Sequence, residues 1–598
     1  MPRLPIVGGE ECAPTETPLL SGLPGFAGKL IALEEARELY RRVNSAPHGF
    51  RLEALLAEMK ITLDVPSADL DRIPVKGPLV VVANHPFGVL DGAALAVLVS
   101  RVRPDVKILA NSVLESVPEL REHCIFVDPF RTPSSTSKNV KPFKHALEWV
   151  HRGGALAVFP SGEVSQWNVR EAQVTDPAWN TLAARLISET GASALPVFFG
   201  GRNSVTFQVL GLINPWLRTL FLLQEFLQQR EKNITVRIGR AIPSELIASL
   251  DNDEEATEYL RLRTYLLSYR GKKPISLPSK VRSALPRKAR EPIAAEVPAQ
   301  FVINDIAALP AERLLIENDE FAVYAARAAE LPHALDELGR LREITFRAAG
   351  EGTGRSADLD AFDAYYWHLL LWNKEKRELA GAYRAGNTDE IIRRYGIKGL
   401  YTNTVFRYDQ QLFLKIGSAL ELGRSFVLPA YQRQYAPLLL LWKGIALFVA
   451  AHPETPVLFG AVSISNEYSS LSREMIVRYF EQREDGREFG DLIQARTPFR
   501  APMLRRWDCG ALCSLLRDPE ELAEPISDIE EDGKGLPILL KQYAKVGGRL
   551  VGFDLDRKFS DVVDGLVIVD LRQTDPSVLA RYMGKEGYAG FRRFHKLG

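Results

Sequence analysis

The chain of 598 residues is 46% hydrophobic and 25% charged, which is the composition of an ordinary globular protein. At about 150 residues per domain, it is too long for one hydrophobic core and is expected to form two to four domains. Its 75 basic and 75 acidic residues cancel. This balance argues against a nucleic-acid-binding body, so no nucleic-acid partner is predicted.

Cysteine usage and hydropathy predict a protein without disulfides and without a membrane-spanning helix. Four cysteines in so long a chain do not make a disulfide framework. Cys509 and Cys513 have no histidine near enough to complete a zinc site, so free thiols and no metal are predicted. The N-terminus lacks the apolar region of a signal peptide. The longest apolar run, residues 436–451, is interrupted by Lys443 and predicts a buried helix.

Hydrophobic periodicity predicts an α/β protein with two fused modules. Residues 24–62 have apolar residues at helical spacing, and short apolar strands alternate with helical stretches from residue 78 to residue 243. Such alternation is typical of a sheet with helices packed on it. The strands are expected at residues 79–83, 106–110, 124–128, 155–159, 194–199 and 234–239. The expected domains are a helical region (1–74), an α/β domain (75–270), a proline-rich linker (271–300) and a second α/β domain (301–598).

The predicted linker is strongly basic. Between Gly271 and Arg290 there is no acidic residue, and the cationic ones are Lys272, Lys273, Lys280, Arg282, Arg287, Lys288 and Arg290. One interpretation is an ordinary solvated linker. The alternative is attraction to an anionic membrane surface or to an acidic carrier protein. Residues 211–223, with Trp216 and Phe221, are predicted to form either an interfacial helix or a buried one.

A histidine and a carboxylate six residues apart follow the apolar strand 79–83. The stretch is Asn84-His85-Pro86-Phe87-Gly88-Val89-Leu90-Asp91, and a helix is expected to begin near Asp91. At such a turn an imidazole can take a proton from a hydroxyl, while the carboxylate fixes its tautomer and stabilises the imidazolium. We therefore predict that His85 is a general base oriented by Asp91. The alternative is that Asp91 only caps the helix and His85 is a core residue.

Polar residues also close three later strands, in an order that resembles a known family. The blocks are Phe126-Val-Asp128-Pro-Phe-Arg131, Phe159-Pro160-Ser161-Gly162-Glu163-Val164-Ser165 and a strand with Pro196. Over about residues 75–245, this order resembles the glycerolipid (1-acylglycerol-3-phosphate type) acyltransferases. The resemblance implies an acyl thioester donor and catalysis by His85 and Asp91. The substrate contacts that it implies are Asn84, Arg131, Gly162 and Glu163.

Two departures from that family bear on the acceptor. Five residues separate His85 from Asp91, where the family has four, and Val164 stands where the family has an arginine expected to hold the acceptor phosphate. A site for a phosphomonoester needs paired cationic donors, so the loss of one argues against glycerol phosphate as acceptor. Glu163 is instead expected to attract a cationic group on the acceptor.

The second module carries charged residues in apolar surroundings. Glu421 and Arg424 lie in the strand-like run 421–427, and Arg342, Asp360, Asp363 and Arg384 precede it. Buried charges are costly unless they are paired, so we expect these residues to form one ionic cluster. The alternative is that they are solvent-exposed.

Over about residues 335–470, the order of these residues resembles the GNAT-like acyltransferases that use acyl-carrier-protein donors. These include acyl-homoserine-lactone synthases and the ornithine-lipid N-acyltransferases labelled haemolysin-like. The resemblance implies that Glu421 relays the proton of an amine and that Arg424 orders the cluster or contacts the acceptor carboxylate. Asp360 and Asp363 would position a cationic acceptor, and Arg342 and Arg384 would complete the substrate site.

The donor is expected to be an acyl carrier protein, with no cofactor bound to the chain. Enzymes of this type that use coenzyme A cradle its pyrophosphate with a glycine-rich loop at a helix N-terminus. The corresponding segment here, residues 429–437, has no glycine. Acyl-CoA is therefore the less favoured donor.

The fusion of both modules resembles the bifunctional ornithine lipid synthases. The expected reactions are N-acylation of an amino acid with a 3-hydroxyacyl group by the second module, and O-acylation of that lyso-aminolipid by the first. The resemblance implies ornithine as the amino acid, and glycine, lysine or another amino acid stay open as alternatives. Such substrates imply a peripheral protein on the inner face of the bacterial cytoplasmic membrane. One rival is a lysophospholipid acyltransferase with a non-catalytic C-terminal GNAT-like domain. The other, a membrane-active or adaptor protein, leaves both sets of motifs unexplained.

Overall fold

The computed structural model describes residues 24–45, 51–128, 133–168, 173–208, 215–271, 290–500 and 513–597. Its contacts divide the chain into two compact units. The first is Met1–Lys272 with Ser527–Gly533, and the second is Lys273–Ile526 with Lys534–Gly598. Each unit is built around one large sheet.

The first unit contains a seven-stranded sheet in the order β1-β9-β8-β2-β5-β3-β4. Strands β8, β2, β5, β3 and β4 run parallel, whereas β9 is antiparallel to β8. Because parallel strands end at the same edge, the turns after β2, β5 and β8 lie together there. The strands are β1 (Thr62–Asp64), β2 (Leu79–Ala83), β3 (Val106–Asn111), β4 (Cys124–Val127), β5 (Ala155–Val158), β8 (Ser193–Gly200) and β9 (Asn233–Ile238).

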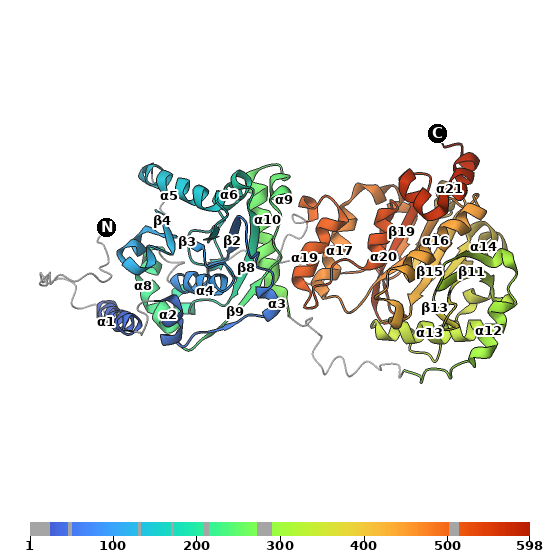
Figure 1. Cartoon of the computed structure of the whole chain (residues 1–598), viewed down its shortest axis with the longest axis horizontal. Helices are drawn as coiled ribbons and strands as arrows, with labels where there is room; N and C mark the ends of the chain where they lie inside the picture. Colours follow the sequence, from blue (N-terminus) through green and yellow to red (C-terminus); the bar gives the residue numbers. More distant parts are fainter. Residues whose placement is uncertain are drawn as a thin grey trace, which may run out of the picture. The chain divides into compact units, whose positions relative to one another are not determined.

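Helices cover both faces of this sheet, which explains why its central strands are continuous apolar runs. Every residue of β2 and β5 is buried, as expected for parallel strands with helices on both sides. One face carries α1 (Pro24–Asn44), α2 (Leu52–Glu58), α4 (Val89–Ser100) and α8 (Pro215–Gln228) (Figure 1). The other face carries α5 (Pro133–His151), α6 (Leu182–Thr190), α9 (Ser244–Ala248) and α10 (Asp253–Leu266) (Figure 1).

The six strands expected from the sequence are confirmed to within one residue at each end. The expected helical region is partly wrong, because Thr62 already belongs to β1. This short strand pairs with β9, whose Asn233 lies opposite Thr62, so a partner distant in sequence overrides the local periodicity. Helix α8 begins at Pro215, while residues 209–214 lie outside the described part of the chain. The surroundings of Trp216 therefore stay a prediction.

The second unit contains an eight-stranded sheet in the order β10-β11-β12-β13-β15-β16-β19-β18. All neighbours are antiparallel except β15 and β16. The strands are β10 (Leu314–Glu317), β11 (Phe321–Arg327), β12 (Trp367–Asn373), β13 (Glu378–Asn387), β15 (Ala419–Val427), β16 (Val457–Ile464), β18 (Arg549–Asp556) and β19 (Val562–Asp570). Residues 291–294 hydrogen-bond to Gly354 and Ser356, so they are attached to this unit.

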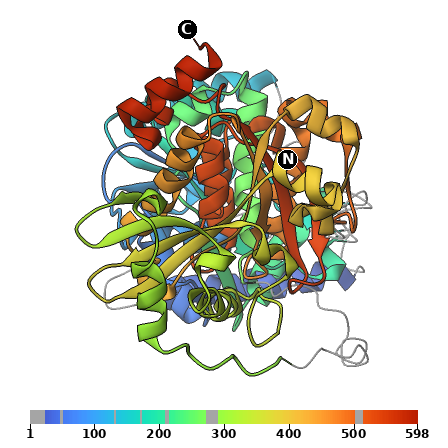
Figure 2. The same ribbon diagram turned by 90° about the vertical axis from the view of Figure 1, so that its right-hand side faces the viewer.

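Helices also pack on both faces of the second sheet. The buried helix expected at residues 436–451 is confirmed as α16 (Ala436–Ala451), which packs against α21 (Pro576–His595), drawn in dark red at the C-terminus in Figure 2. The opposite face holds α12 (Ala299–Ala307) and α13 (Ala334–Ala348). The remaining helices are α14 (Thr388–Tyr395), α15 (Gln410–Ile416), α17 (Ser470–Gln482), α20 (Ile538–Lys545) and α19 (Pro519–Ile529), whose residues from Ser527 onward belong to the first unit. Among the described residues, no helix combines the length and apolarity needed to cross a membrane.

The sheet of the second unit opens in its middle. Strands β15 and β16 pair only from Ala419 to Glu421 and from Val457 to Phe459. At the next position, a Cβ on Gly460 would lie 2.1 Å from the backbone oxygen of Leu422, a distance that only glycine permits. Beyond this point the strands diverge, and a cavity lies between residues 422–425 and residues 461–463.

Candidate active sites

The turn after β2 brings His85 and Asp91 together. The chain passes through Gly88, whose φ of +82° favours glycine, and enters α4 at Val89. Nδ1 of His85 then lies 3.2 Å from Oδ2 of Asp91. The same carboxylate oxygen accepts hydrogen bonds from the N–H groups of Phe87 (2.7 Å) and Gly88 (3.0 Å). The five intervening residues are thus accommodated, and Asp91 both caps the helix and faces the imidazole.

The pair combines a buried carboxylate with a partly exposed imidazole. The side chain of Asp91 is fully buried, whereas that of His85 is 18% exposed. Burial raises the pKa of Asp91, although His85 and the two backbone amides oppose the shift. The ring of His85 packs on Phe159 of the next motif, with 4.2 Å between the ring centroids. With Nδ1 turned toward Asp91, Nε2 is the nitrogen available to a substrate.

A buried aspartate that sequence reasoning missed, Asp176, holds the backbone of this site. Its Oδ1 accepts hydrogen bonds from the N–H of His85 (3.1 Å) and from Oγ of Ser165 (2.5 Å). Its Oδ2 accepts a hydrogen bond from Nε1 of Trp179 (2.9 Å). The N–H of Ser165 also donates to the carbonyl of His85 (2.9 Å). Asp176 belongs to no motif of the resemblance, and an isolated aspartate before a proline gives no signal in sequence.

The other predicted residues of the first site differ in how close to His85 they lie and in how exposed they are. Both atoms of the Asn84 amide bond the backbone of Phe199 (2.9 and 2.7 Å), which ties β2 to β8 beside the histidine. Gly162 has a φ of +66° in the turn after β5, and Glu163 follows it on the surface. Val164 is buried beside Gly88. Arg131 lies outside the described residues, so its substrate contact stays a prediction.

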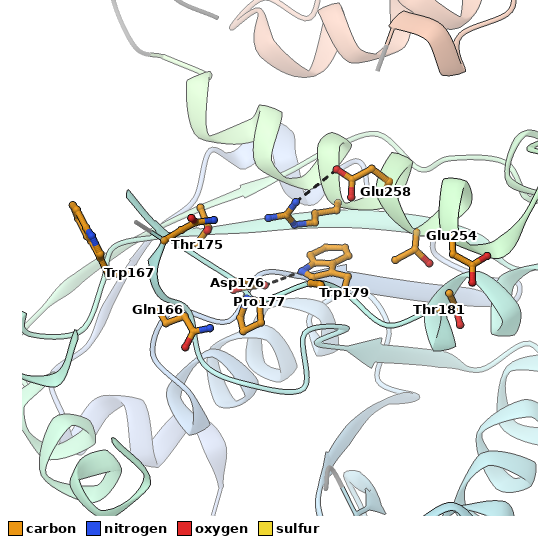
Figure 3. A pocket seen from close by; sticks show the side chains of 13 residues that line it. Gln166, Trp167, Thr175, Asp176, Pro177, Trp179, Thr181, Glu254 and Glu258 are labelled. Atoms are coloured by element: carbon orange, nitrogen blue, oxygen red, sulfur yellow. Dashed lines mark hydrogen bonds and ion pairs between the residues drawn. The ribbon is translucent and has the colours of Figure 1, made fainter. Parts of the chain in front are cut away.

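A cavity of about 540 Å³ lies beside the Asp176 segment in the first unit. Figure 3 shows the indole of Trp179 joined to Asp176, with Glu254 and Glu258 of α10 on the cavity wall. His85 is not among the residues that line this cavity. The two features share Asp176, because one of its oxygens bonds the wall of the cavity and the other bonds the backbone of His85.

In the second unit, the expected ionic cluster is present, but the inclusion of Glu421 in it was wrong, because Glu421 forms no ion pair with a described residue. Arg342 donates to Asp363 (2.8 Å) and Arg384 donates to Asp360 (2.7 Å). Nε of Arg424 lies 3.1 Å from Asp358, a residue that sequence analysis did not single out. The side chains of Arg342 and Arg384 are at most 1% exposed. The cluster is therefore a set of buried ion pairs and not a solvated charge run.

The electrostatics of this cluster favour the ionised forms of Asp363 and Arg384. Burial alone would raise the pKa of Asp363, but Arg342 and Arg384 hold it well below its usual range. Burial would lower the pKa of Arg384, yet Asp363 and Asp360 raise it. Burial and the neighbouring Arg342 lower the pKa of His368, next to the cluster, to about 4. The charges of Asp360 and Asp363 are thus largely satisfied within the protein.

The carboxylate of Glu421 is occupied by hydrogen bonds to a neighbouring turn and to a tyrosine. Its carboxylate accepts hydrogen bonds from the N–H groups of Tyr401 (3.1 Å) and Thr402 (2.6 Å) and from the hydroxyl of Tyr366. Burial raises its pKa, although Thr402 and Tyr366 oppose the shift. Of the described residues, its neighbours Leu422, Gly423 and Arg424 line the cavity of this unit, but Glu421 does not.

The cavity in the opening of the sheet, about 120 Å³, holds two carboxyl groups that sequence reasoning missed. They are Glu351, in the loop after α13, and Asp564 of β19. Arg424 lines the same cavity with a φ of +49°, an unusual conformation for a residue with a side chain. No motif marks Glu351 or Asp564, which are more than 200 residues apart, because only the folded sheet brings them together.

Family models agree with this division into two units. A model described as acyltransferase matches residues 14–271, and one described as acetyltransferase (GNAT) domain matches residues 341–443. The fold and the two sites therefore define an enzyme with two acyltransferase modules in one α/β chain.

Curated relatives narrow this class. A glycine N(alpha)-acyltransferase of Bacteroides thetaiotaomicron is 30% identical over 263 residues, which are 41% of this chain and 76% of the relative. The chain belongs to the aminolipid acyltransferase family that includes this protein. A relative of the same name from Phocaeicola vulgatus is 29% identical over 268 residues (42% of this chain, 80% of the relative). A lyso-glycine lipid O-acyltransferase of Bacteroides thetaiotaomicron is 26% identical over 224 residues (36% and 79%).

Proposed function

We propose that the chain is a bifunctional acyltransferase that makes an N,O-diacylated amino-acid lipid. The observation that carries this proposal is that one chain is similar to two different proteins, an amino-acid N-acyltransferase and a lyso-lipid O-acyltransferase. The names of these relatives describe consecutive reactions, since N-acylation of an amino acid produces a lyso-lipid. Fusion of the two modules keeps a poorly soluble intermediate near the site that uses it.

The GNAT-like unit performs the first step, transfer of a 3-hydroxyacyl group from an acyl carrier protein to the amine. The 3-hydroxyl of this product supplies the nucleophile for the second step. Arg424 lines the cavity and is proposed to contact the acceptor carboxylate. Glu421 holds the Tyr401–Thr402 turn at the cavity wall, and we assign it a positioning role. Arg342, Arg384, Asp360 and Asp363 fix the surrounding loop through their ion pairs.

The acceptor is an α-amino acid, with glycine and ornithine as the two candidates. The names of the relatives favour glycine. The fusion of both modules, which resembles the bifunctional ornithine lipid synthases, favours ornithine. The two predicted products differ in head-group mass, so one measurement separates them.

His85 performs the second step as general base. Nε2 takes the proton of the lyso-lipid 3-hydroxyl, and its oxygen attacks the thioester carbonyl carbon of the acyl donor. A C–O bond forms, the C–S bond breaks, and the imidazolium returns the proton to the departing thiolate. Asp91, 3.2 Å from Nδ1, stabilises the imidazolium formed in between. Val164, buried beside Gly88, offers no cation for a phosphate, which agrees with an acceptor that has none.

Lipid mass spectrometry of a bacterial host without aminolipids tests both steps. The host expresses the wild type, His85→Ala or Glu421→Ala. The wild type is expected to yield a diacylated aminolipid whose head-group fragment identifies the amino acid. His85→Ala is expected to accumulate the monoacylated amide, and Glu421→Ala is expected to yield neither lipid. Expression of both variants in one cell should restore the diacylated product, which shows that each retains one working module.

The opposite pattern would contradict the proposal. If the wild type forms no aminolipid and only remodels host phospholipids, the chain is a lysophospholipid acyltransferase. If His85→Ala still forms the diacylated lipid, the first unit does not esterify the intermediate.

A further inference from the structure

The cavity of the second unit contains a carboxylate that has no partner of its own. Glu351 is 9% exposed and lines the cavity. Its side chain has no hydrogen-bond partner among the described residues, whereas its backbone N–H donates to Phe346 (2.8 Å). A buried carboxylate normally carries at least one such bond, because an unpaired charge is costly to bury.

A second carboxylate faces the same cavity. Asp564 is 3% exposed, and its Oδ1 accepts a hydrogen bond from Oγ of Ser463 (2.8 Å). No described residue bonds its Oδ2. Asp564 and Glu351 repel each other strongly enough for Asp564 to raise the pKa of Glu351. Two nearby carboxylates with spare acceptor capacity in one small cavity are suited to a cation.

Arg424, a cationic residue that lines this cavity, also has partners within the protein. Arg424 lies 3.1 Å from Asp358 and donates to the hydroxyl of Tyr401 (2.9 Å). Its guanidinium also stacks on the rings of Tyr401 and Phe559, each 4.7 Å from the ring centroid. The charge of Arg424 lowers the pKa of Glu351 and Asp564 only in part, because both pKa values remain raised. The negative charge of the two carboxylates can therefore be balanced further by a second positive group.

We propose that Glu351 and Asp564 bind the ammonium group of the acceptor amino acid, and that one of them accepts its proton before acyl transfer. This inference rests on the proposed function and names the residues that serve its first step. The carboxylate takes one proton from the ammonium, and the free amine attacks the thioester carbonyl carbon. A C–N bond forms and the C–S bond breaks. The second proton of the nitrogen leaves with the thiolate, and the carboxyl releases its proton to solvent.

The electrostatic environment suits this task. Burial and the charge of Asp564 raise the pKa of Glu351 to about 8. Burial and the charge of Asp556 raise the pKa of Asp564 to about 7. A base that titrates near neutral pH can take a proton from an amine and release it again. The charged groups that act on the pair are Arg424 on β15, Asp554 and Asp556 on β18, and Glu467 before α17.

The test uses the purified full-length chain in the His85→Ala background, so that the amide product accumulates. The donor is 3-hydroxyhexadecanoyl acyl carrier protein, and glycine and ornithine are varied from pH 5 to pH 9. The variants are Glu351→Gln and Asp564→Asn, which imitate the neutral carboxyls. The control is Glu474→Gln, because Glu474 is a buried carboxyl of α17 with a pKa raised by burial to about 7 that does not line the cavity.

For the parent, kcat/KM for the amino acid is expected to fall as the pH drops below about 8, since the carboxyls become protonated. Each cavity variant should lower kcat/KM at pH 8 at least tenfold. It should also reduce the dependence of kcat/KM on pH below pH 8, whereas Glu474→Gln should keep the pH profile of the parent. If both cavity variants keep the kcat/KM of the parent and its pH dependence below pH 8, the assignment is overturned. The melting temperatures of the parent and the variants are compared at pH 5, where both carboxyls are neutral in the parent. Equal values show that a loss of activity in a variant is not due to misfolding.

A binding measurement separates this inference from the proposed function. If the parent forms no amide with either amino acid, the proposed function fails, and glycine and ornithine are then titrated calorimetrically into the parent and the variants. Binding to the parent that both cavity variants weaken at least tenfold supports the ammonium site. No binding to the parent, or equal binding to the variants, rejects it.

Discussion

The two units solve the problem of placing reactive groups in opposite ways. In the first, the two residues that face each other at 3.2 Å are six positions apart in one turn. In the second, the conspicuous charges neutralise one another, and two carboxyls that line the cavity, Glu351 and Asp564, come from separate elements. A pair of residues that are close in sequence can be predicted from a motif. A site whose residues come from distant segments of the chain cannot, because only the folded sheet brings them together.

The sharpest test of this contrast is His85→Ala. Loss of a general base lowers O-acylation by about 100- to 10,000-fold, while N-acylation in the other unit should be unchanged. The rates are measured separately, with the lyso-lipid and with the free amino acid as acceptor. His151→Ala, at the exposed end of α5, is the control and should retain both rates. A comparable loss in both activities would show that the units do not work independently.

The scaffold role of the ionic cluster is tested by Asp363→Asn. Removal of one partner leaves Arg342 and part of the Arg384 charge buried without compensation. The expected cost is about 3–5 kcal/mol in the free energy of unfolding of the second unit. Denaturant unfolding of the purified chain measures it, with Asp336→Asn on the exposed side of α13 as control. A loss of N-acylation at unchanged stability would instead place Asp363 at the substrate.

Asp176→Asn tests whether the local pair depends on distant support. The amide cannot accept every hydrogen bond that the carboxylate receives from His85, Ser165 and Trp179. We expect a roughly 10- to 100-fold decrease in kcat for O-acylation, because small misplacements of a base are costly. Asp251→Asn, at an exposed position before α10, should have no effect. A decrease in stability without one in kcat would make Asp176 purely structural.

The smallest expected effect concerns the pH dependence of stability in Glu351→Gln. The pKa of Glu351 is raised from 4.5 to about 8 in the folded protein. The stability contributed by its proton is therefore complete below about pH 4.5 and is lost as the pH rises to about 8. The glutamine variant does not ionise, so its melting temperature should match the wild type at pH 5 and exceed it by at least about 3 °C at pH 9. If the variant and the wild type have the same melting temperature at pH 9 as well as at pH 5, Glu351 is not buried as described.

Sequence predicted the elements of the first unit well because its central strands are long apolar runs between clear breaks. It also predicted the pairing of His85 with Asp91 and the joining of Arg342, Arg384, Asp360 and Asp363 in one cluster. It did not find β1, whose existence depends on pairing with β9. Asp176, Glu351 and Asp564 were invisible for the same reason, because single acidic residues acquire meaning only from what the fold sets beside them.

The divergence of β15 and β16 gives the middle of a large sheet two internal edges. Past Glu421 and Phe459 these strands no longer bond each other, while each keeps its other neighbour, β13 or β19. Amides that face the opening are therefore expected to exchange with deuterium like those of an outermost strand, although they belong to central ones. With Gly460 fixing where the strands part, this fast-exchanging seam should begin at one defined residue, and a ligand seated there should slow it.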